Sequence, residues 1–396
     1  MTVEIRPARL EEMEEFTRVA STALAMPVES FIGIKPEFTL CAFENGKLAT
    51  TYGAWPLIMR FNGEGIPVAG VTSVSTFPIY RRRGYLRQIT TRHFQFLHER
   101  GEQPIAILLA SLVAIYQRYG YSVVSTRYSY DVEPRHLTFA LDQPVNGTLC
   151  EMGDDEFGLL VDLYRRFRED RIGYIHRGQA MWNYGVLVPP PAGSQLIKVV
   201  YEEAGQPQGY VIYVMTSLGK AMPRQRVTIR DLIWLTAPAY RAIWNHFSAM
   251  DLANSIVWER VPADDPLPHL LLEPRMLHIT AQDGILGRIV DIERAFSKLR
   301  FNDEGTLTFE VIDELCPWNR GKWRLETSST RTSIHRTRKD TQLVMPVSTL
   351  AMLVFGQVSA TEAARMERLE VKDKSALLVW DRVMHTKYRP FCADLF

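Results

Sequence analysis

The segment that most constrains this chain is an apolar stretch that runs directly into three consecutive arginines and a glycine. It reads Val-Ser-Thr-Phe-Pro-Ile-Tyr-Arg-Arg-Arg-Gly-Tyr-Leu-Arg from Val74 to Arg87, and the pattern predicts a helix from Leu86 to His98. A strand that passes through a glycine-containing turn into a helix directs several backbone N–H groups at one point, where the helix dipole also favours negative charge. Arginine side chains add strong donors for phosphate oxygens. The segment therefore predicts a diphosphate-binding loop, and the alternative is a solvated basic turn.

The length and charge of the chain exclude several classes of protein. With 396 residues it is too long for one typical core, and we expect two or three domains. A net charge of +1, with 46% hydrophobic and 23% charged residues, gives no overall attraction to nucleic acid or to an anionic membrane. No apolar run approaches the roughly 20 residues of a membrane span, and the charged start is unlike a secretory signal.

The cysteines and histidines predict neither a metal site nor a disulfide framework. The four cysteines lie far apart, and the nine histidines show no spacing typical of metal ligands. Scattered single cysteines are typical of a reducing compartment, so we expect a cytoplasmic protein without bound metal.

The first 150 residues predict a mixed α/β domain. A helix from Arg9 to Leu24 has apolar residues along one face, and Asn45-Gly46 is a strong hairpin signal between two strands. Further strands are expected at 68–77, 104–111 and 123–130, with a short helix at 113–119. The expected order in this domain is a helix, a hairpin, a strand, the arginine loop, a helix, a strand, a short helix and a last strand.

The segment 151–284 repeats this order weakly, and the segment 285–396 does not. In the second copy, the stretch that corresponds to the arginine loop runs from Asp231 to Trp244 and contains no glycine and only one arginine, Arg241. It should therefore not bind a diphosphate; two unrelated mixed domains are the alternative to a duplication. The last segment predicts a helix at 289–299 followed by strands and helices, and its basic run at 330–339 is interpreted as a solvated loop. We expect three domains: 1–150, 151–284 and 285–396.

Four pieces of the sequence together resemble the Eis (enhanced intracellular survival) family of GNAT acetyltransferases. They are the arginine loop, Ile-Tyr-Gln-Arg-Tyr-Gly-Tyr at 115–121, Ala-Tyr-Arg-Ala-Ile-Trp at 239–244 with Asp251, and the ending Pro-Phe-Cys-Ala-Asp-Leu-Phe at 390–396. The loop fits the family's (Gln/Arg)-x-x-Gly-x-(Gly/Ala) pattern, except that Leu86 takes the last position. The resemblance implies two fused GNAT folds and a C-terminal α+β domain similar to sterol carrier proteins.

The same resemblance implies an N-acetyltransferase with acetyl-CoA as co-substrate, and it assigns residues to that reaction. The backbone of Val74, Ser75 and Thr76 would pair with the pantetheine arm, and Ser111 and Leu112 would lie near the thioester. The diphosphate would be held by the loop residues Arg81, Arg82, Arg83, Gly84, Tyr85, Leu86 and Arg87. Tyr116 would be the proton donor, and the terminal carboxylate of Phe396 would be the proton acceptor. A homo-oligomer, a hexamer in this family, is also implied.

The chain departs from the family pattern at two positions where an acidic residue is frequent, namely Leu112 and Leu395. Both changes remove negative charge that would attract a polycationic amine, which argues against aminoglycoside-type substrates. The resemblance leaves the acceptor open between a primary amine of a small molecule and a protein lysine. A lipid- or small-molecule-binding role of the last domain is a further alternative.

The proposed acid and base can also be judged from their chemistry. A phenol is a neutral donor at pH 7, with a pKa not far above that of a thiol, so Tyr116 suits a departing thiolate. Tyr119 and Tyr121 are close competitors, although helical spacing turns them to other faces. A terminal carboxylate is a weak base unless it is partly buried or acts through water. The apolar end of the chain favours a docked tail over a frayed one.

Overall fold

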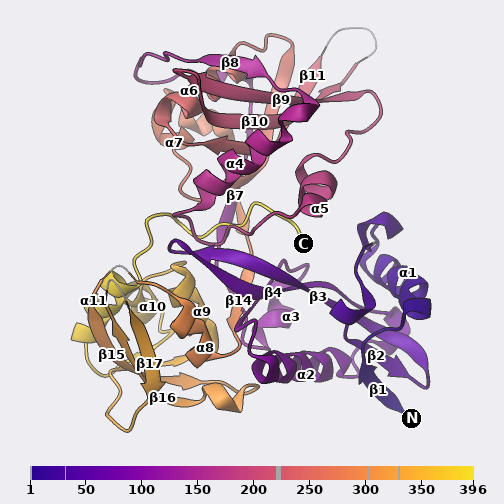
Figure 1. Ribbon diagram of the computed structural model, residues 1–396, viewed down its shortest axis with the longest axis vertical. Helices are drawn as coiled ribbons and strands as arrows, with labels where there is room; N and C mark the ends of the chain where they lie inside the picture. The colour runs from indigo at the N-terminus through magenta and orange to yellow at the C-terminus, as the bar shows by residue number, and fades with distance from the viewer. Residues whose placement is uncertain (1, 32, 220–223, 302, 329–330) are drawn as a thin grey trace. The chain divides into compact units, whose positions relative to one another are not determined.

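The computed structural model describes residues 2–31, 33–219, 224–301, 303–328 and 331–396. The chain forms two compact units (Figure 1). The first contains Met1–Val124, Ile285–His385 and Phe396, and the second contains Ser125–Gly284 and Thr386–Leu395. Each unit is built from mixed sheets with helices packed on them, which confirms the expected α/β fold class. In the described ranges, no helix is both long and apolar enough to span a bilayer.

The first unit contains a mixed sheet with the strand order β1-β2-β3-β4-β5-β14-β6. Its strands are β1 Val3–Arg6, β2 Cys41–Glu44, β3 Lys47–Phe61, β4 Glu64–Thr76, β5 Ile105–Leu108, β6 Ser122–Val123 and β14 Leu286–Ile289. The predicted hairpin between β2 and β3 is confirmed, since Asn45 and Gly46 both have positive φ, 49° and 78°, as a tight turn between twisted strands requires.

Helices cover both faces of this sheet because the side chains of each strand alternate between the two faces. Cys41 and Phe43 of β2 pack with Phe16 and Val19 of α1 (Met13–Leu24). Ala42, which lies between them, belongs to the core on the opposite side, together with helix α2 (Tyr85–Arg100). The short helix α3 (Val113–Gln117) follows β5 in the chain.

The first unit also contains a second sheet, with the order β17-β16-β15-β18-β19. Its elements are α8 Ile292–Lys298, β15 Gly305–Ile312, β16 Gly321–Thr327, β17 Thr332–Arg336, β18 Leu343–Pro346, α9 Val347–Phe355, α10 Ala360–Arg365, β19 Glu370–Val371 and α11 Ser375–Val383. Phe309 of β15 joins the helices to this sheet, since its ring contacts Trp380 of α11 and Phe296 of α8 at centroid distances of 5.2 and 6.2 Å.

The second unit repeats the arrangement of a sheet between helices. Its strand order is β13-β7-β12-β11-β10-β9-β8. The bounds are β7 Thr126–Val132, β8 Thr148–Glu151, α4 Phe157–Arg168, α5 Gln179–Met181, β9 Ser194–Glu203, β10 Gln206–Ser217, β11 Gln225–Trp234, α6 Ala237–Ser248, β12 Ala253–Pro262, α7 Leu267–Leu270 and β13 Thr280–Asp283. Tyr210 and Ile212 of β10 pack with α4, and Val211 and Tyr213 pack with α6, so these helices lie on opposite faces (Figure 1).

The sheets exchange strands in a way that differs from the expected segment boundaries. The strand expected at 123–130 is two strands: Ser122–Val123 stays in the first sheet, and Thr126–Val132 pairs with β12 and β13 in the second unit. Conversely, Leu286–Ile289 lies between β5 and β6 in the first sheet. The compact units therefore divide after Val124 and Gly284, and the expected boundary after residue 150 lies inside the second unit.

Two further expectations differ from the structure in the last segment. The helix expected at 289–299 begins only at Ile292, because Ile289 ends strand β14 and Asp291 caps the helix by accepting a hydrogen bond from the Arg294 amide. The basic run at 330–339 is not a loop: Thr332–Arg336 forms β17, and positions 329 and 330 lie outside the described residues. Thr332 and Ile334 of this strand are buried, so alternate residues pack on the sheet although charged residues surround them in the sequence.

The exchanged strand β14 packs so closely that Gly287 tolerates no side chain. A Cβ atom there would lie 2.9 Å from both Phe355 Cε2 and Val124 Cγ2, and both of these side chains are fully buried. We expect Gly287→Ala to lower the free energy of unfolding by about 1–3 kcal/mol through overpacking, measured by urea denaturation. Gly158→Ala in helix α4, where nothing lies within 4 Å of the new Cβ, is the control and should be neutral or stabilising. Equal stabilities for both variants would contradict the tight packing.

Candidate active site

The central feature of the first sheet is the separation of two parallel strands. Strand β4 pairs with β5 from Val68–Ile105 to Val71–Leu108, and there the pairing ends. β4 continues to Thr76, whereas β5 stops at Leu108. Backbone groups of β4 beyond Val71 are therefore available to an extended partner other than β5. The predicted residues Val74, Ser75 and Thr76 lie in this part of β4.

A β-bulge accompanies the separation. The register of β4 with β3 shifts between Thr51 and Gly53, and Ser73 has a φ of 52°, which is unusual for a residue with a side chain. The Thr51 hydroxyl donates to the Ser73 carbonyl at 2.7 Å, and it lies 2.6 Å from the Ser75 hydroxyl. These bonds hold the bulge in place, and a bulge bends a strand away from its neighbour.

The arginine loop forms the start of helix α2. Arg82 has a φ of 65° and Gly84 a φ of 79°, and Gly84 is the residue that precedes the first turn of the helix. The first amides of a helix have no acceptor within it, so those of Tyr85, Leu86 and Arg87 face outwards. A Cβ atom on Gly84 would have nothing within 4 Å. The loop therefore leaves its amide donors uncovered, which suits an anion.

The arginines of this loop have different partners. Arg83 forms an ion pair with Glu44 of β2, with Nη1 2.6 and 2.7 Å from the two carboxylate oxygens. The Tyr85 hydroxyl also donates to Glu44, and these two bonds, the tyrosine first, lower the pKa of the Glu44 carboxyl. Tyr85 is buried, so the pair fixes the loop to the sheet.

Arg81 is also engaged with the protein. Its guanidinium donates to the carbonyls of Thr76 and Ala23, each at 3.3 Å. Arg82 and Arg87 are exposed, and in the described residues their guanidinium groups make no hydrogen bond. Of the predicted diphosphate ligands, Arg82, Arg87 and the helix amides are therefore available to an anion. Arg81 and Arg83 instead hold the shape of the loop.

The predicted thioester and acid residues follow strand β5. Ser111 is exposed. Leu112, which immediately precedes helix α3, is 64% exposed. Tyr116 of α3 is half-buried, with its ring 6.0 Å from the ring of Tyr121 in an edge-to-face arrangement. Burial raises the pKa of Tyr116 to about 12, so its phenol keeps its proton at neutral pH.

Beneath Tyr116 and Tyr121 lies a buried pair that the sequence did not reveal. The Tyr52 hydroxyl of β3 is 2.7 Å from Nδ1 of His93 on α2, and both side chains are buried. Burial lowers the pKa of His93 to about 4, so the imidazole is neutral. The two residues are 41 positions apart and share no motif, so only the packing of α2 on the sheet brings them together.

The last residue of the chain belongs to the first unit. Phe396 is half-buried, and a Cβ atom on Gly70 of β4 would come within 3.0 Å of Phe396 Cδ2. Gly70 pairs with Ile107 of β5, one residue before the strands separate. The absence of a side chain at Gly70 thus leaves room for the terminal aromatic ring beside β4.

In the second unit, the region that corresponds to the arginine loop is closed. Helix α6 begins after Thr236, whose hydroxyl accepts a hydrogen bond from the Ala239 amide. The side chain of Arg241 donates to the Leu141 carbonyl at 2.9 Å and lies over the Phe139 ring. The capped amide and the engaged arginine leave no loop like that at Gly84.

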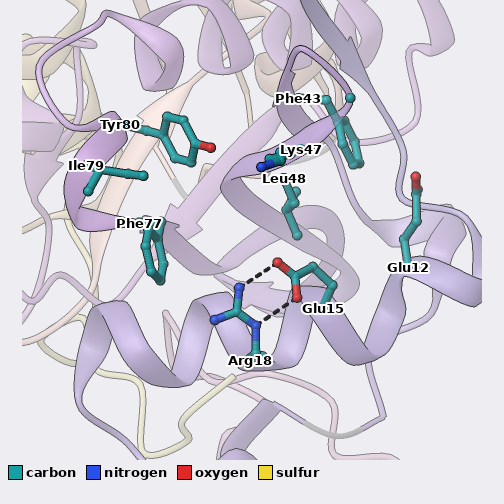
Figure 2. A pocket seen from close by; sticks show the side chains of 10 residues that line it. Glu12, Glu15, Arg18, Phe43, Lys47, Leu48, Phe77, Ile79 and Tyr80 are labelled. Carbon is teal, nitrogen blue, oxygen red and sulfur yellow. Dashed lines mark hydrogen bonds and ion pairs between the residues drawn. The ribbon is translucent and has the colours of Figure 1, made fainter.

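A cavity of about 380 Å³ lies next to the arginine loop but does not include its predicted residues. Its wall is formed by α1, by the β2–β3 hairpin and by the turn Phe77–Tyr80. Figure 2 shows Phe77, Ile79 and Tyr80 on one side of it, with Arg18 paired to Glu15 at 2.6 Å on α1. The cavity is thus separate from the gap between β4 and β5.

Comparison with known proteins identifies the domains. Residues 4–124 and 173–289 each match an acetyltransferase (GNAT) domain, and residues 292–393 match a sterol carrier protein domain. The two GNAT matches together cover more than half of the 396 residues.

The chain is also similar to several whole proteins. An uncharacterized N-acetyltransferase of Streptomyces avermitilis is 28% identical over 414 residues, which cover 100% of this chain and 99% of that protein. The N-acetyltransferase Eis of Mycobacterium tuberculosis is 27% identical, covering 79% of this chain and 76% of that protein.

Solved structures share the entire fold. Eis1 from Mycobacterium abscessus matches with a TM-score of 0.84 and 25% identity, covering 100% of both chains. A GCN5-related N-acetyltransferase from Anabaena variabilis matches with a TM-score of 0.88 over 100% of both chains. At 20% identity, this match is evidence for a shared fold only. The domain order and these relatives define the class as the GNAT N-acetyltransferases. Within this class, the chain belongs to the Eis family, with two GNAT domains followed by a sterol carrier domain, as the sequence predicted.

We expect the buried His93 to make stability depend on pH. Its folded-state pKa of about 4 lies below the usual 6.5, so the unfolded chain binds a proton that the folded chain does not bind. Stability is therefore lost as pH falls from 6.5 to 4, by about 3 kcal/mol from this group. His93→Phe should remove that part of the pH dependence, measured as unfolding free energies in urea at pH 7 and pH 4.5. The exposed His335, changed in the same way, is the control; an identical slope in the His93 variant would refute the assignment.

Proposed function

We propose that the chain transfers the acetyl group of acetyl-CoA to a primary amine in the gap between β4 and β5. The observation that carries this proposal is the end of the β4–β5 pairing at Val71 and Leu108 beside an open, amide-lined loop at Gly84. An extended pantetheine arm has amide groups that can pair with the free edge of a strand, and the diphosphate needs the donors of a helix start.

The proposed role of each binding residue follows from its backbone or guanidinium groups that have no partner among the described residues. The backbone of Val74, Ser75 and Thr76 would pair with the pantetheine arm. The amides from Gly84 to Arg87 and the guanidinium groups of Arg82 and Arg87 would bind the diphosphate. Ser111 and Leu112, after β5, would border the thioester.

The reaction requires two proton movements. The amine nitrogen attacks the thioester carbonyl carbon, and the terminal carboxylate of Phe396 accepts the proton that the amine loses. The carbon–sulfur bond then breaks, and the Tyr116 phenol gives its proton to the sulfur, so the products are an amide and a thiol. Water returns a proton to Tyr116, and the carboxylate releases one, which balances the cycle.

The raised pKa of Tyr116, about 12, is compatible with this role. Burial keeps the phenol protonated, which a donor requires before each turnover. The departing thiolate loses solvation in the same surroundings, and its affinity for a proton rises for the same reason. Proton transfer between two desolvated groups is then less unfavourable than their usual pKa values suggest.

The acceptor proposed is a small primary amine of low charge. Leu112, 64% exposed, stands where the family frequently has an acidic residue, so this position offers an apolar contact to the acceptor instead of a charge. A protein lysine is the second acceptor class. The family likeness also supports the proposals of a homo-hexamer and of a cytoplasmic location.

The first test concerns the diphosphate. Arg82→Ala should raise the Kd for acetyl-CoA by about tenfold or more, because a charge-assisted hydrogen bond contributes roughly 1.5–3 kcal/mol. Isothermal titration calorimetry at low salt measures this change. The control is Arg92→Ala, which removes an exposed arginine from the same helix and should leave the Kd unchanged. An unaltered Kd in the Arg82 variant would place the diphosphate elsewhere.

The second test concerns the acid and the base. Release of free thiol is followed against a panel of small amines and lysine peptides, which also identifies the acceptor class. Tyr116→Phe should lower kcat about 100-fold with acetyl-CoA binding retained, and Tyr119→Phe is its control. A chain extended by two glycines beyond Phe396 moves the terminal carboxylate and should lose turnover to a similar extent. Full activity of the extended chain would exclude the carboxylate as the base.

A further inference from the structure

The second GNAT domain has its own pair of separating strands. Strand β11 pairs in parallel with β12 from Gln225–Ala253 to Ile229–Trp258. Beyond this point, β11 continues to Trp234 and β12 to Pro262 without pairing to each other. This repeats the arrangement of β4 and β5, although the loop that would hold a diphosphate is closed.

The C-terminal segment of the chain fills this second gap. Phe391 and Ala393 line a space of only about 10 Å³ together with residues of β11 and β12. Phe391 packs in the same core as Ile233 of β11, and Arg260 of β12 donates to the Ala393 carbonyl at 3.2 Å. The segment thus takes the place that an extended ligand would take in an open GNAT domain.

The backbone of the segment is also tightly held. The Phe391 amide donates to the Ile172 carbonyl at 3.0 Å. The next residue, Gly173, has a φ of 93°, and a Cβ atom there would lie 2.6 Å from the Phe391 carbonyl oxygen. Only glycine allows this approach, so the packing fixes which residue of the tail lies at this point.

A buried ion pair fixes the segment three residues further along, at Asp394. Arg177 Nε lies 2.7 Å from Asp394 Oδ1, and its Nη1 lies 2.5 Å from Asp231 of β11. The Tyr164 hydroxyl donates to Asp394 at 3.2 Å, and the Tyr210 hydroxyl donates to Asp231 at 2.7 Å. Arg177 and Asp394 are 4% and 7% exposed, and the Arg177 guanidinium also lies over the rings of Tyr164 and Trp182, so protein groups surround both charges.

A buried ion pair of this kind is not needed for packing. Apolar residues of similar volume are often as stable, and the best-attested use of buried polar pairs is to specify register. Register matters here because Phe396 lies two residues beyond Asp394, a span of at most about 7 Å. A shift of the C-terminal segment by one residue would move Phe396 by about 3.3 Å. This is more than the variation in donor–acceptor distance that proton transfer allows.

We propose that the second GNAT domain is a holder for the C-terminal segment, in which Arg177 binds Asp394 and thereby sets the position of the Phe396 carboxylate. Arg177 and Asp394 are positioning residues in this proposal. Its functional consequence rests on the proposed role of that carboxylate as the base.

The test uses the full chain with Asp394→Asn, which keeps the shape of the side chain and removes its charge. Carboxypeptidase digestion, followed by mass spectrometry, measures how fast Phe396 and Leu395 are released, and this readout is independent of activity. We expect release at least tenfold faster than from the unaltered chain. We also expect kcat to fall at least tenfold with a changed pH profile, and the Kd for acetyl-CoA to stay within twofold.

Two controls separate this effect from general destabilisation. Asp170→Asn removes an exposed ion pair with Lys387 of the same segment, and Asp313→Asn breaks a buried pair with Arg288 in the first unit. Neither should accelerate release of the last residues. If Asp394→Asn does not fold, Tyr164→Phe removes the hydroxyl that bonds Asp394 and the Ile175 carbonyl without removing a charge, and release should again be faster, by a smaller factor.

The outcomes distinguish this proposal from the proposed mechanism. Faster release with reduced kcat supports both. Faster release with unchanged kcat supports the holder and overturns the carboxylate as the base. Unchanged release from a folded Asp394 variant overturns the holder, whatever the activity, and the extended chain then decides the role of the carboxylate by itself.

Discussion

The structure depends on a backbone constraint: two parallel strands that separate leave polar groups that something else must satisfy. In the first sheet, the pairing of β4 with β5 ends after Leu108, and the bulge at Ser73 keeps the strands apart. In the second unit, β11 and β12 separate after Ile229 and Trp258, and Phe391 and Ala393 of the C-terminal segment lie there. One fold thus gives two equivalent gaps. The first lies beside the loop proposed to bind an anion, and Phe391 and Ala393 line the second.

The loop shows why counting charges in a sequence overestimates a binding site. Three consecutive arginines suggest three ligands for a diphosphate. Arg83 is bound to Glu44 and Arg81 to backbone carbonyls, so both stabilise the shape of the loop. That shape in turn gives Arg82 its positive φ and exposes the amides at Gly84. An arginine can therefore shape such a loop while its own guanidinium is already engaged by the protein.

Local patterns predicted the features that are local. The Asn45-Gly46 hairpin, the helix after Gly84 and the second copy without a loop were readable because each depends on neighbouring residues. The exchange of Thr126–Val132 and Leu286–Ile289 between sheets was not, since an alternating pattern says nothing about which strand will be its partner. The pair of Arg177 and Asp394, 217 positions apart, was hidden for the same reason.

The proposed use of the terminal carboxylate as a catalytic base would place an unusual demand on a protein. A side-chain carboxylate is positioned by one rotamer, whereas a terminal carboxylate is positioned by the register of every residue that precedes it. Chain ends are normally the least ordered part of a domain, and tight packing is needed to order them. The close approach at Gly173 and the ion pair at Arg177 supply two fixed points within four residues of each other along the tail, at Phe391 and Asp394. Both fixed points come from the second GNAT domain, in which Thr236 caps helix α6 and Arg241 is bound to the Leu141 carbonyl, so this domain contributes contacts to the tail instead of an open loop.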